Sequence, residues 1–455
     1  MSDHLQAALK YAHQHDAEFL GSLQEMLSFG SISTSDEHKN EIYKTAEWVV
    51  KRLKALGMER AEVMPTAGYP VVYGEWLGAP GKPTVLIYGH YDVQPVDPLD
   101  LWHTEPFTAT LKGDNLYARG ASDMKGQVMA CLNAVEAIVR TGQLPVNVKF
   151  MIEGEEEIGS PSLDAWIDAN KDLLKADFCL NPDAGMLGKN HPTITYGLRG
   201  LASFELTVSG PNHDLHSGIY GGAVHNPAKA LAELLAGMHD ENNHITLPGF
   251  YDSVRPLSDE ERTHLAALPV GDDFIKQQTG VPEVWGEAGY TSVERATGRP
   301  TLEINGMTSG FTGTGQKTII PAWAMAKITC RLVPDQAPEA IYENIKHYLE
   351  AKAPNTIRWE LKMYGGGRAS ISDINKPWVT ALASAMETVW GTPPLFKREG
   401  GSVPVVGMMQ SALGMESVLT GFGLPDDNLH APNEKLDMPT WRKGTETLIR
   451  FFFNL

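Results

Sequence analysis

Histidine and carboxylate side chains follow short apolar runs at several separate points of the sequence. His90 and Asp92 come directly after the apolar run Thr84–Tyr88, and a cluster of glutamates that begins with Glu153 follows the run Val146–Ile152. Other candidates lie near further predicted elements: Asp123, Asp183 and His430. In open α/β sheets, ligands bind outside the carboxyl ends of the strands. We therefore expect these distant segments to meet in one crevice.

Such a crevice would hold at least four carboxylates. Carboxylates that are packed together repel one another and raise one another's pKa unless cations neutralise them, and two divalent metal ions would do so. Histidine and carboxylate ligands without cysteine suit zinc, manganese or cobalt better than calcium, which prefers oxygen ligands. In two-metal sites the ions lie about 3.5 to 4 Å apart. We expect Asp123, at the start of a predicted helix, to bridge them.

The elements that must position these residues form an alternating pattern of strands and helices. Nearly continuous apolar runs predict buried strands at Thr84–Tyr88, Val146–Ile152, Ala176–Leu180 and Ser417–Gly421. Apolar residues at helical spacing predict helices at Glu41–Leu56, Met124–Arg140, Leu163–Leu174 and Pro377–Trp390. This alternation indicates an α/β fold in which helices cover a mostly parallel sheet.

The middle of the chain has a different pattern. Apolar and polar residues alternate, as in antiparallel strands with one exposed face, at Leu201–Val208, Ala322–Leu332 and Ile357–Met363. Helices are predicted at Pro227–Met238 and Pro338–Leu349. The run Gly365–Gly367 predicts a linker. We therefore expect a catalytic domain made of residues 1–198 and 369–455, and an inserted α+β domain at residues 199–368.

The composition argues against several classes of partner. The 455 residues include 38 Lys and Arg and 56 Asp and Glu, a formal charge of −18, which disfavours nucleic acids and anionic membranes. The long apolar stretch Val403–Leu424 is interrupted by polar residues, and the N-terminus does not resemble a signal peptide. The three cysteines are too few and too scattered for a disulfide framework. We expect a cytoplasmic protein with a small-molecule or short-peptide partner.

Ten short stretches resemble motifs of the co-catalytic di-zinc metallopeptidases. Five are similar to the ligand motifs of that family: YGHYDV (Tyr88–Val93), ARGASDMKG (Ala118–Gly126), EGEEEIGS (Glu153–Ser160), NPDAG (Asn181–Gly185) and LHAPNE (Leu429–Glu434). Five narrow the resemblance to the carnosinase and cytosolic nonspecific dipeptidase branch: ITYGLRG (Ile194–Gly200), DLHSGIYGG (Asp214–Gly222), KTIIP (Lys317–Pro321), RLVPD (Arg331–Asp335) and REGGSVP (Arg398–Pro404). The family also includes aminoacylases, acetylornithine deacetylase and succinyl-diaminopimelate desuccinylase. The resemblance extends over essentially the whole chain.

This resemblance implies a centre with two divalent metal ions per subunit. One ion would be bound by His90, Asp123 and Asp183, and the other by Asp123, Glu157 and His430. Zinc is the expected metal, and manganese is the alternative.

The resemblance also implies the catalytic residues. Asp92 would accept a hydrogen bond from the second ring nitrogen of His90. Glu156 would be the general base, which takes a proton from the metal-bridging water and returns it to the leaving amine. His216 would bind the carbonyl oxygen that becomes negative in the tetrahedral intermediate. In this family that histidine comes from the partner subunit, so a homodimer is implied, with the inserted domain as its lid and dimerisation domain.

Four further residues are implied to bind the substrate. Arg331 and Ser402 would hold its C-terminal carboxylate, for which a guanidinium group is well suited. Thr318 would contribute from across the dimer, and Glu399 would lie near the amino end. Because a free amine and a free carboxylate would both be held at short range, we predict a metal-dependent dipeptidase.

Other functions are open at this point. An amidohydrolase that removes the acyl group from N-acyl amino acids would use the same metal centre, and the small segment Ala184–Met186, where some relatives have aromatic residues, leaves the side-chain preference open. A non-catalytic binding protein of the same fold is disfavoured, because all expected ligands and Glu156 are present. A glycosidase with paired carboxylates would leave His90 and His430 without a role.

Overall fold

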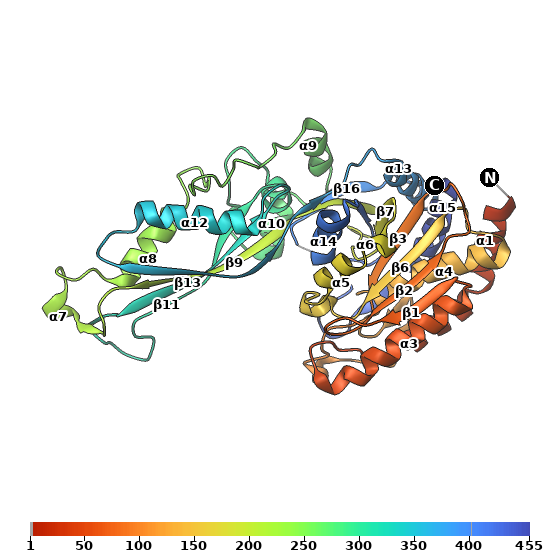
Figure 1. Cartoon of the computed structure of the whole chain (residues 1–455), viewed down its shortest axis with the longest axis horizontal. Coiled ribbons are helices and arrows are strands. Elements are labelled where there is room, and N and C mark those ends of the chain that lie inside the picture. The colour runs from red at the N-terminus through yellow and green to blue at the C-terminus, as the bar shows by residue number, and fades with distance from the viewer. Residues whose placement is uncertain (1–2, 402) are drawn as a thin grey trace. The chain divides into compact units, whose positions relative to one another are not determined.

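The computed structural model describes residues 3–401 and 403–455 and divides into two compact units (Figure 1). The first unit comprises Met1–Tyr196, Ser372–Lys397 and Met408–Leu455. The second unit comprises Gly197–Ile371 and Arg398–Gly407. The second unit is therefore built mainly from one continuous middle segment, to which a short later segment returns.

The helices and strands before residue 200 belong mainly to the first unit. Its helices are α1 (Asp3–Gln14), α2 (Asp16–Leu27), α3 (Lys39–Ala55), α4 (Lys125–Thr141), α5 (Leu163–Ala169) and α6 (Lys171–Leu174). Its strands are β1 (Arg60–Met64), β2 (Val71–Trp76), β3 (Thr84–His90), β4 (Thr110–Lys112), β5 (Asn115–Tyr117), β6 (Asn147–Glu153), β7 (Phe178–Asn181) and β8 (Thr193–Leu198). Short 3-10 turns lie at Asp36–His38, Leu99–Leu101 and Glu156–Ile158.

The remaining elements form the second unit and complete the first. The middle of the chain contains β9 (Gly200–Ser209), β10 (Leu215–His216), α7 (Ser217–Tyr220), α8 (Pro227–Ala236), α9 (Asp259–Ala266), α10 (Asp272–Thr279), α11 (Ser292–Thr297), β11 (Thr301–Ser309), β12 (Ile319–Ile320), β13 (Trp323–Leu332), α12 (Pro338–Lys352), β14 (Arg358–Gly367) and β15 (Ser370–Ile371). The last part contains α13 (Pro377–Trp390), β16 (Leu395–Glu399), α14 (Pro404–Leu413), β17 (Ser417–Leu419), β18 (Lys435–Asp437) and α15 (Met438–Asn454).

The central sheet of the first unit has a parallel core. Its strands follow the order β1-β2-β6-β3-β7-β17-β8. The pairs β6–β3, β3–β7 and β7–β17 are parallel, whereas β1, β2 and β8 pair in the antiparallel sense. Strand β6 is buried along its whole length, as expected for a strand that is covered on both faces. The predicted α/β class with a mostly parallel sheet is confirmed.

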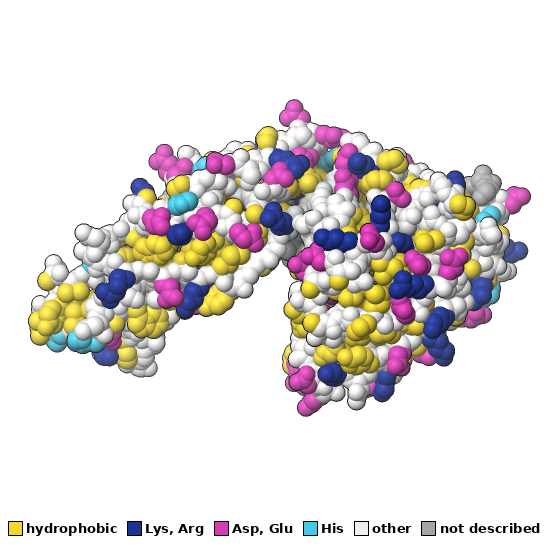
Figure 2. All heavy atoms as spheres, in the orientation of Figure 1, with side chains coloured by type: hydrophobic (Ala, Val, Ile, Leu, Met, Phe, Trp, Pro, Cys, Tyr) yellow, Lys and Arg dark blue, Asp and Glu magenta, His cyan; other side chains and the backbone are white. Residues whose placement is uncertain are grey.

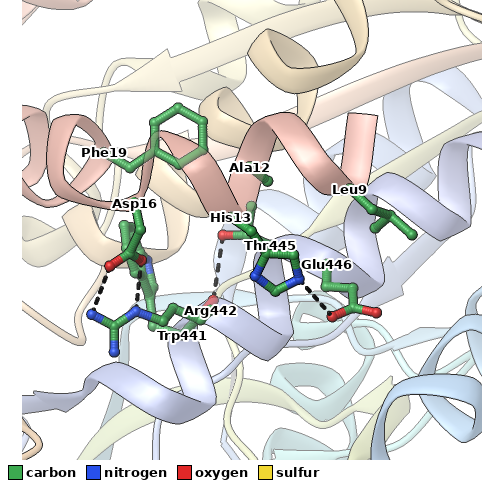
Figure 3. Close-up of a pocket in the computed structure, with 9 residues that line it drawn as sticks. All are labelled: Leu9, Ala12, His13, Asp16, Phe19, Trp441, Arg442, Thr445 and Glu446. Atoms are coloured by element: carbon green, nitrogen blue, oxygen red, sulfur yellow. Dashed lines mark hydrogen bonds and ion pairs between the residues drawn. The ribbon is translucent and has the colours of Figure 1, made fainter. Parts of the chain in front are cut away.

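Helices from both ends of the chain pack together in the first unit. Helix α4 contacts β3, and it is covered in turn by α1, α2 and α15. At the junction of α2 and α15, Nε and Nη2 of Arg442 donate hydrogen bonds to the two carboxylate oxygens of Asp16, at 2.6 and 2.9 Å (Figure 3). Nearby, His13 lies 4.0 Å from Glu446 across a shallow groove. These contacts fix the terminal helices around α4, the helix that follows Asp123.

The second unit contains a four-stranded antiparallel sheet in the order β11-β13-β9-β14. Residues of β9 alternate between buried and half-buried positions along the strand, in agreement with the predicted single exposed face. The buried side chains pack with residues of α8 and α12 into a separate hydrophobic core. The second unit therefore has its own core.

One expectation for this unit is wrong. The run Gly365–Gly367, predicted as a linker, is the end of β14, and it pairs with Leu201, Ala202 and Ser203 of β9 after a bulge. A Cβ on Gly366 would lie 2.6 Å from the carbonyl oxygen of Leu201 and 2.7 Å from the Cβ of Pro338. The glycine at 366 therefore allows a close approach of backbones instead of a flexible connection.

Two further observations concern the whole described chain. Among residues 3–401 and 403–455, there is no helix long and apolar enough to cross a lipid bilayer. Cys131, Cys179 and Cys330 are buried free thiols.

Candidate active site

The candidate residues of the first unit lie on strands and loops at the carboxyl ends of the parallel strands. Strand β3 ends at His90, which lies opposite Glu153, the last residue of β6. The 3-10 turn Glu156–Ile158 follows β6, and Asp183 follows the end of β7. Asp123 and His430 come from the loops before α4 and β18: these loops are 118–124 and 425–434. The adjacent parallel strands thus position this group, as the sequence predicted.

Asp123 is at the centre of the group. Its Oδ1 lies 3.2 Å from Nε2 of His90, and its Oδ2 lies 2.9 Å from Nε2 of His430. The same nitrogen of His430 lies 3.3 Å from Oε2 of Glu157. One ligand atom each from His90, Asp123 and Glu157 lie within 4.8 Å of one another, close enough for the three residues to hold one metal ion. The structure therefore brings four of the five predicted ligands into direct contact.

Asp183, the fifth predicted ligand, lies close enough to this group to be perturbed by it. Burial raises the pKa of Asp183 well above its ordinary value, and the nearby Asp123, Glu156 and Glu157 carboxylates raise it further, although His90 acts in the opposite sense. Burial and Asp123 likewise raise the pKa of Glu157 to about 7. These carboxylates therefore interact unfavourably when all are ionised.

The two histidines compensate for only part of this charge. Burial opposes the ionised form of Asp123, but hydrogen bonds from His430 and His90 outweigh it, so the pKa of Asp123 is lowered. In return, the hydrogen bond to Asp123 raises the pKa of His430 to about 9. A set of nitrogen and oxygen donors with excess negative charge suits divalent cations. The residues present thus fit divalent metal, and the presence of two ions stays a prediction.

Asp92 holds the turn that carries the two glutamates. Its carboxylate oxygens accept hydrogen bonds from the backbone N–H groups of Glu156 and Glu157, at 3.2 and 3.1 Å. Nδ1 of His90 lies 3.0 Å from the backbone carbonyl oxygen of Asp92 and 3.4 Å from its Oδ1. Asp92 is fully buried. It therefore links the first candidate ligand to the candidate base.

The four glutamates at the end of β6 and just after it have different surroundings. Glu153 accepts hydrogen bonds from the hydroxyl groups of Tyr88 and Ser160. Glu155 accepts from the backbone N–H groups of Tyr69 and Ser162, at 2.9 and 3.1 Å. Both carboxylates are thus engaged by protein donors, whereas Glu156 and Glu157 lie close enough to Asp123 for its charge to raise the pKa of each. This difference supports the choice of Glu156 and Glu157 as the functional pair of the cluster.

In the second unit, the structure brings His216 and Thr318 together. Strand β10 pairs with β12, so that His216 lies opposite Ile319. The carbonyl oxygen of Thr318 accepts a hydrogen bond from the N–H of Ser217 at 3.0 Å. Nδ1 of His216 accepts one from the N–H of Gly218 at 3.0 Å. Both His216 and Thr318 are exposed.

A second group of candidates lies elsewhere in the second unit. Arg331 is on β13, and its side chain lines the same cavity as Arg199. Burial, and then the like charge of Arg331, lower the pKa of Arg199 to about 10. Glu399 is the last residue of β16, and its carbonyl oxygen accepts from the N–H of Arg199 at 3.2 Å. Ser402 lies outside the described residues.

Two residues at the site received no role from the sequence. Gln94 donates a hydrogen bond from Nε2 to Oε2 of Glu157 at 2.7 Å. Glu434, which is buried, accepts one from the backbone N–H of Asp123 at 3.0 Å. Gln94 lies four residues after His90, and Glu434 ends the stretch LHAPNE, so their neighbours in the sequence were the available signal.

Comparisons with known proteins agree with this geometry. The sequence model of the protein family described as "Peptidase family M20/M25/M40" matches residues 86–454 of this chain. The chain is 33% identical over 453 residues to the Cys-Gly metallodipeptidase DUG1 of Candida albicans, with 95% of this chain and 93% of the relative covered. It is 32% identical over 469 residues to the Beta-Ala-His dipeptidase of Homo sapiens, with 99% and 92% covered.

A solved structure with a similar fold is that of an M20 family metallo-carboxypeptidase from Sulfolobus solfataricus. The TM-score is 0.82 and the sequence identity is 36%, with 96% of this chain and 98% of that chain covered.

Proposed function

The chain belongs to peptidase family M20/M25/M40, and from this we propose that it is a metal-dependent dipeptidase that hydrolyses the peptide bond of free dipeptides. The observation that carries the proposal is the carboxylate of Asp123, which contacts His90 on one side and His430 on the other, beside Glu156 and Glu157. The relatives from Candida albicans and Homo sapiens are both named as dipeptidases.

Two divalent ions would be held beside the ends of the parallel strands. We propose that His90, Asp123 and Asp183 bind one ion, and that Asp123, Glu157 and His430 bind the other. Zinc is the proposed native metal, because it is commonly bound by such mixed nitrogen and oxygen donors, and manganese accepts the same ligands. When bound, such ions lower the pKa of water and polarise a carbonyl oxygen.

Glu156 is the proposed general base. Its backbone N–H is held by Asp92, and burial raises the pKa of its carboxyl above the ordinary value. A carboxylate whose pKa is raised in this way accepts a proton from water more readily, and it can then donate the proton to the leaving amine. We propose that Asp92 acts by orienting both His90 and this turn.

The second unit is proposed to bind the ends of the substrate. Arg331, with Ser402, is suited to the C-terminal carboxylate, because a guanidinium group offers parallel donors to two oxygens. Thr318 is proposed to assist from the partner subunit, and Glu399 to lie near the free amine. Recognition of both ends at short range would limit the enzyme to dipeptides.

We also propose a homodimer in which His216 of one subunit stabilises the oxyanion in the site of the other. Hydrophobic side chains gather at the end of the second unit that carries α7 (Figure 2), where Ile219 is 69% exposed and Tyr220 is 42% exposed. Phe311, in the loop before Thr318, is also exposed. Contiguous exposed apolar residues commonly mark protein interfaces, which supports contact between two copies around His216.

The dimer proposal is testable by mixing two inactive variants. Glu156→Gln lacks the base, and His216→Ala lacks the proposed oxyanion donor. If His216 acts across the dimer, each mixed dimer contains one complete site, and co-expression should recover about a quarter of the wild-type activity. If His216 acts within its own subunit, mixing should recover none. Light scattering on each variant checks that dimers form.

The decisive test of the dipeptidase proposal is hydrolysis by metal-stripped protein with zinc, manganese or no metal added back. We expect release of both amino acids from free dipeptides, dependent on metal and lost in Glu156→Gln. Cleavage of N-acetylated amino acids in place of dipeptides would show a deacylase. Release of C-terminal residues from longer peptides at comparable rates would show a carboxypeptidase.

We further propose a cytoplasmic location, which the buried, reduced state of all three cysteines supports. Fractionation of the source cells, with an antibody against the chain, tests this proposal.

A further inference from the structure

We propose that Glu434 is a positioning residue, which joins the loops that carry Asp123 and His430 and so sets the affinity of the site for metal. The inference rests on the proposed metal site. Glu434 has an exposed fraction of 0%, and it lies four residues after His430 in the sequence. Its carboxylate points away from solvent and into the loop that precedes α4.

Four donors of that loop converge on this single carboxylate. Oε1 accepts hydrogen bonds from the backbone N–H groups of Ser122 and Asp123, at 2.9 and 3.0 Å. Oε2 accepts from the backbone N–H of Gly120 at 2.8 Å and from Nη1 of Arg119 at 2.7 Å. Residues 118–124 are neither helix nor strand. The backbone at Asp123 is therefore positioned largely by Glu434.

The same two loops are joined on either side of this carboxylate. Strand β18 pairs with β5, and the N–H of Ala118 donates to the backbone carbonyl oxygen of Glu434 at 3.1 Å. At the other end of the His430 loop, Asp427 accepts from Oγ of Ser122 at 2.9 Å and from Nζ of Lys435 at 3.0 Å. The loop with His430 is thus fastened to the loop with Asp123 at three points.

Arg119 balances the charge of Glu434 inside the protein. The guanidinium group is buried, donates to the carbonyl oxygen of Pro95 at 2.9 Å and lies 5.5 Å from the ring of Trp102. Glu434 is consequently engaged by protein donors on both oxygens, and it is a support for the neighbouring ligands and not a ligand itself. Supports of this kind commonly change metal affinity by about 10- to 100-fold when they are removed.

The first test is the variant Glu434→Gln. Glutamine has one acceptor oxygen, so at least two of the four hydrogen bonds are lost, and its NH₂ group faces donors. We expect the affinity for zinc to fall by about 10- to 100-fold. The measurement is competition with a chromophoric chelator, without substrate. We also expect excess zinc to restore most of the activity of this variant, which loss of folded protein would not allow.

The matched control is Glu136→Gln. Glu136 lies near the end of α4, the helix that begins after Asp123, and it forms an ion pair with the half-buried Arg52. This variant therefore also takes the carboxylate partner from an arginine that has little exposure to solvent. We expect a comparable decrease in melting temperature with unchanged zinc affinity. An equal loss of zinc affinity in Glu136→Gln, or none in folded Glu434→Gln, would overturn the inference.

If Glu434→Gln fails to fold, Glu434→Asp decides the question. Aspartate keeps the charge opposite Arg119, but it moves the acceptor oxygens back by one methylene group. We expect a folded protein with weakened zinc binding, and wild-type affinity would contradict the proposal. Wild-type protein that binds no divalent ion would refute the metal site itself. If the wild type binds metal but cleaves no dipeptide, only the proposed substrate is wrong.

Discussion

The candidate metal ligands and the candidate oxyanion donor differ in how firmly the chain holds them. In the first unit, Asp123 is contacted by two histidines through its side chain and by Glu434 through its backbone. In the second unit, His216 is exposed on a two-residue strand, and its ring accepts from Gly218 within its own turn. The candidate metal ligands are thus held by contacts from several segments of one unit, whereas the ring of His216 is held by a contact within its own turn.

Substitution of Asp123, the central residue of the candidate metal site, should have the strongest effect on activity. Asp123→Ala removes the carboxylate that both proposed ions share and leaves His90 and His430 without their common acceptor. We expect loss of both ions and a decrease in kcat/KM of about 10⁴-fold or more, because metal ions supply several kcal/mol of transition-state stabilisation. Elemental analysis of the purified variant checks the metal content. Retention of two ions per subunit would contradict the bridging role.

The next prediction concerns Glu156, whose loss should affect the catalytic step and not the binding of metal. Glu156→Gln should decrease kcat by about 10³-fold, the usual range for general acid–base catalysis, and should leave the metal content unchanged. Glu155→Gln is the control, because Glu155 accepts from Tyr69 and Ser162 and lies away from the ligands. Steady-state kinetics of both variants measure the difference. If Glu155→Gln has the larger effect on kcat, the base has been wrongly assigned.

Substitution of the exposed His216 should change activity but not stability. His216→Ala should decrease kcat by about 10²-fold, as for the loss of an oxyanion donor. Its melting temperature should stay within about 1 °C of the wild type, because exposed substitutions usually change stability little. His213→Ala, an exposed histidine of the same segment, should change neither. A large fall in melting temperature of His216→Ala would show that this tip is also a structural element.

The sequence predicted the parts of the site that depend on local pattern. Apolar runs located β3, β6 and β7, and parallel strands deliver the residues that follow them to one edge. For that reason the order of residues along the chain predicted that His90, the glutamates after β6 and Asp183 would meet. The choice of Glu157 as a ligand came from the family resemblance, and the roles of all three residues stay predictions. Helix α13 begins and ends at the predicted residues, since proline opens it and glycine follows it.

The sequence did not predict features that depend on contacts between distant segments. Glu434 receives hydrogen bonds from residues more than 300 positions away. Its place in the stretch LHAPNE put it near His430 in the sequence, but it did not indicate these contacts. Gly365–Gly367 has the composition of a linker, but pairing with β9 makes it a strand. Both cases depend on which distant backbone segments come into contact. A single sequence predicts such contacts only where regular strands or helices bring the segments together.

The last prediction concerns the buried carboxyl group of Glu153, which lies in the first unit and has no proposed catalytic role. Burial, and then the nearby Asp92, raise the pKa of Glu153 from 4.5 to about 8. At pH 7 this carboxyl is therefore protonated in the folded protein and ionised in the unfolded chain. The unfolded state binds fewer protons between these two values, so the free energy of unfolding contributed by Glu153 falls as the pH rises from about 5 to 8.

Glu153→Gln should remove this dependence, because the amide imitates the protonated carboxyl and its oxygen can still accept from Tyr88 and Ser160. We expect the metal-free variant to be less stable than, or equal to, the wild type at pH 5.5, and to gain roughly 2 °C or more relative to it at pH 8.5. Thermal unfolding at the two pH values measures the change. A constant difference between the two proteins would mean that Glu153 is ionised in the fold, and that the first unit tolerates more buried negative charge than its hydrogen bonds indicate.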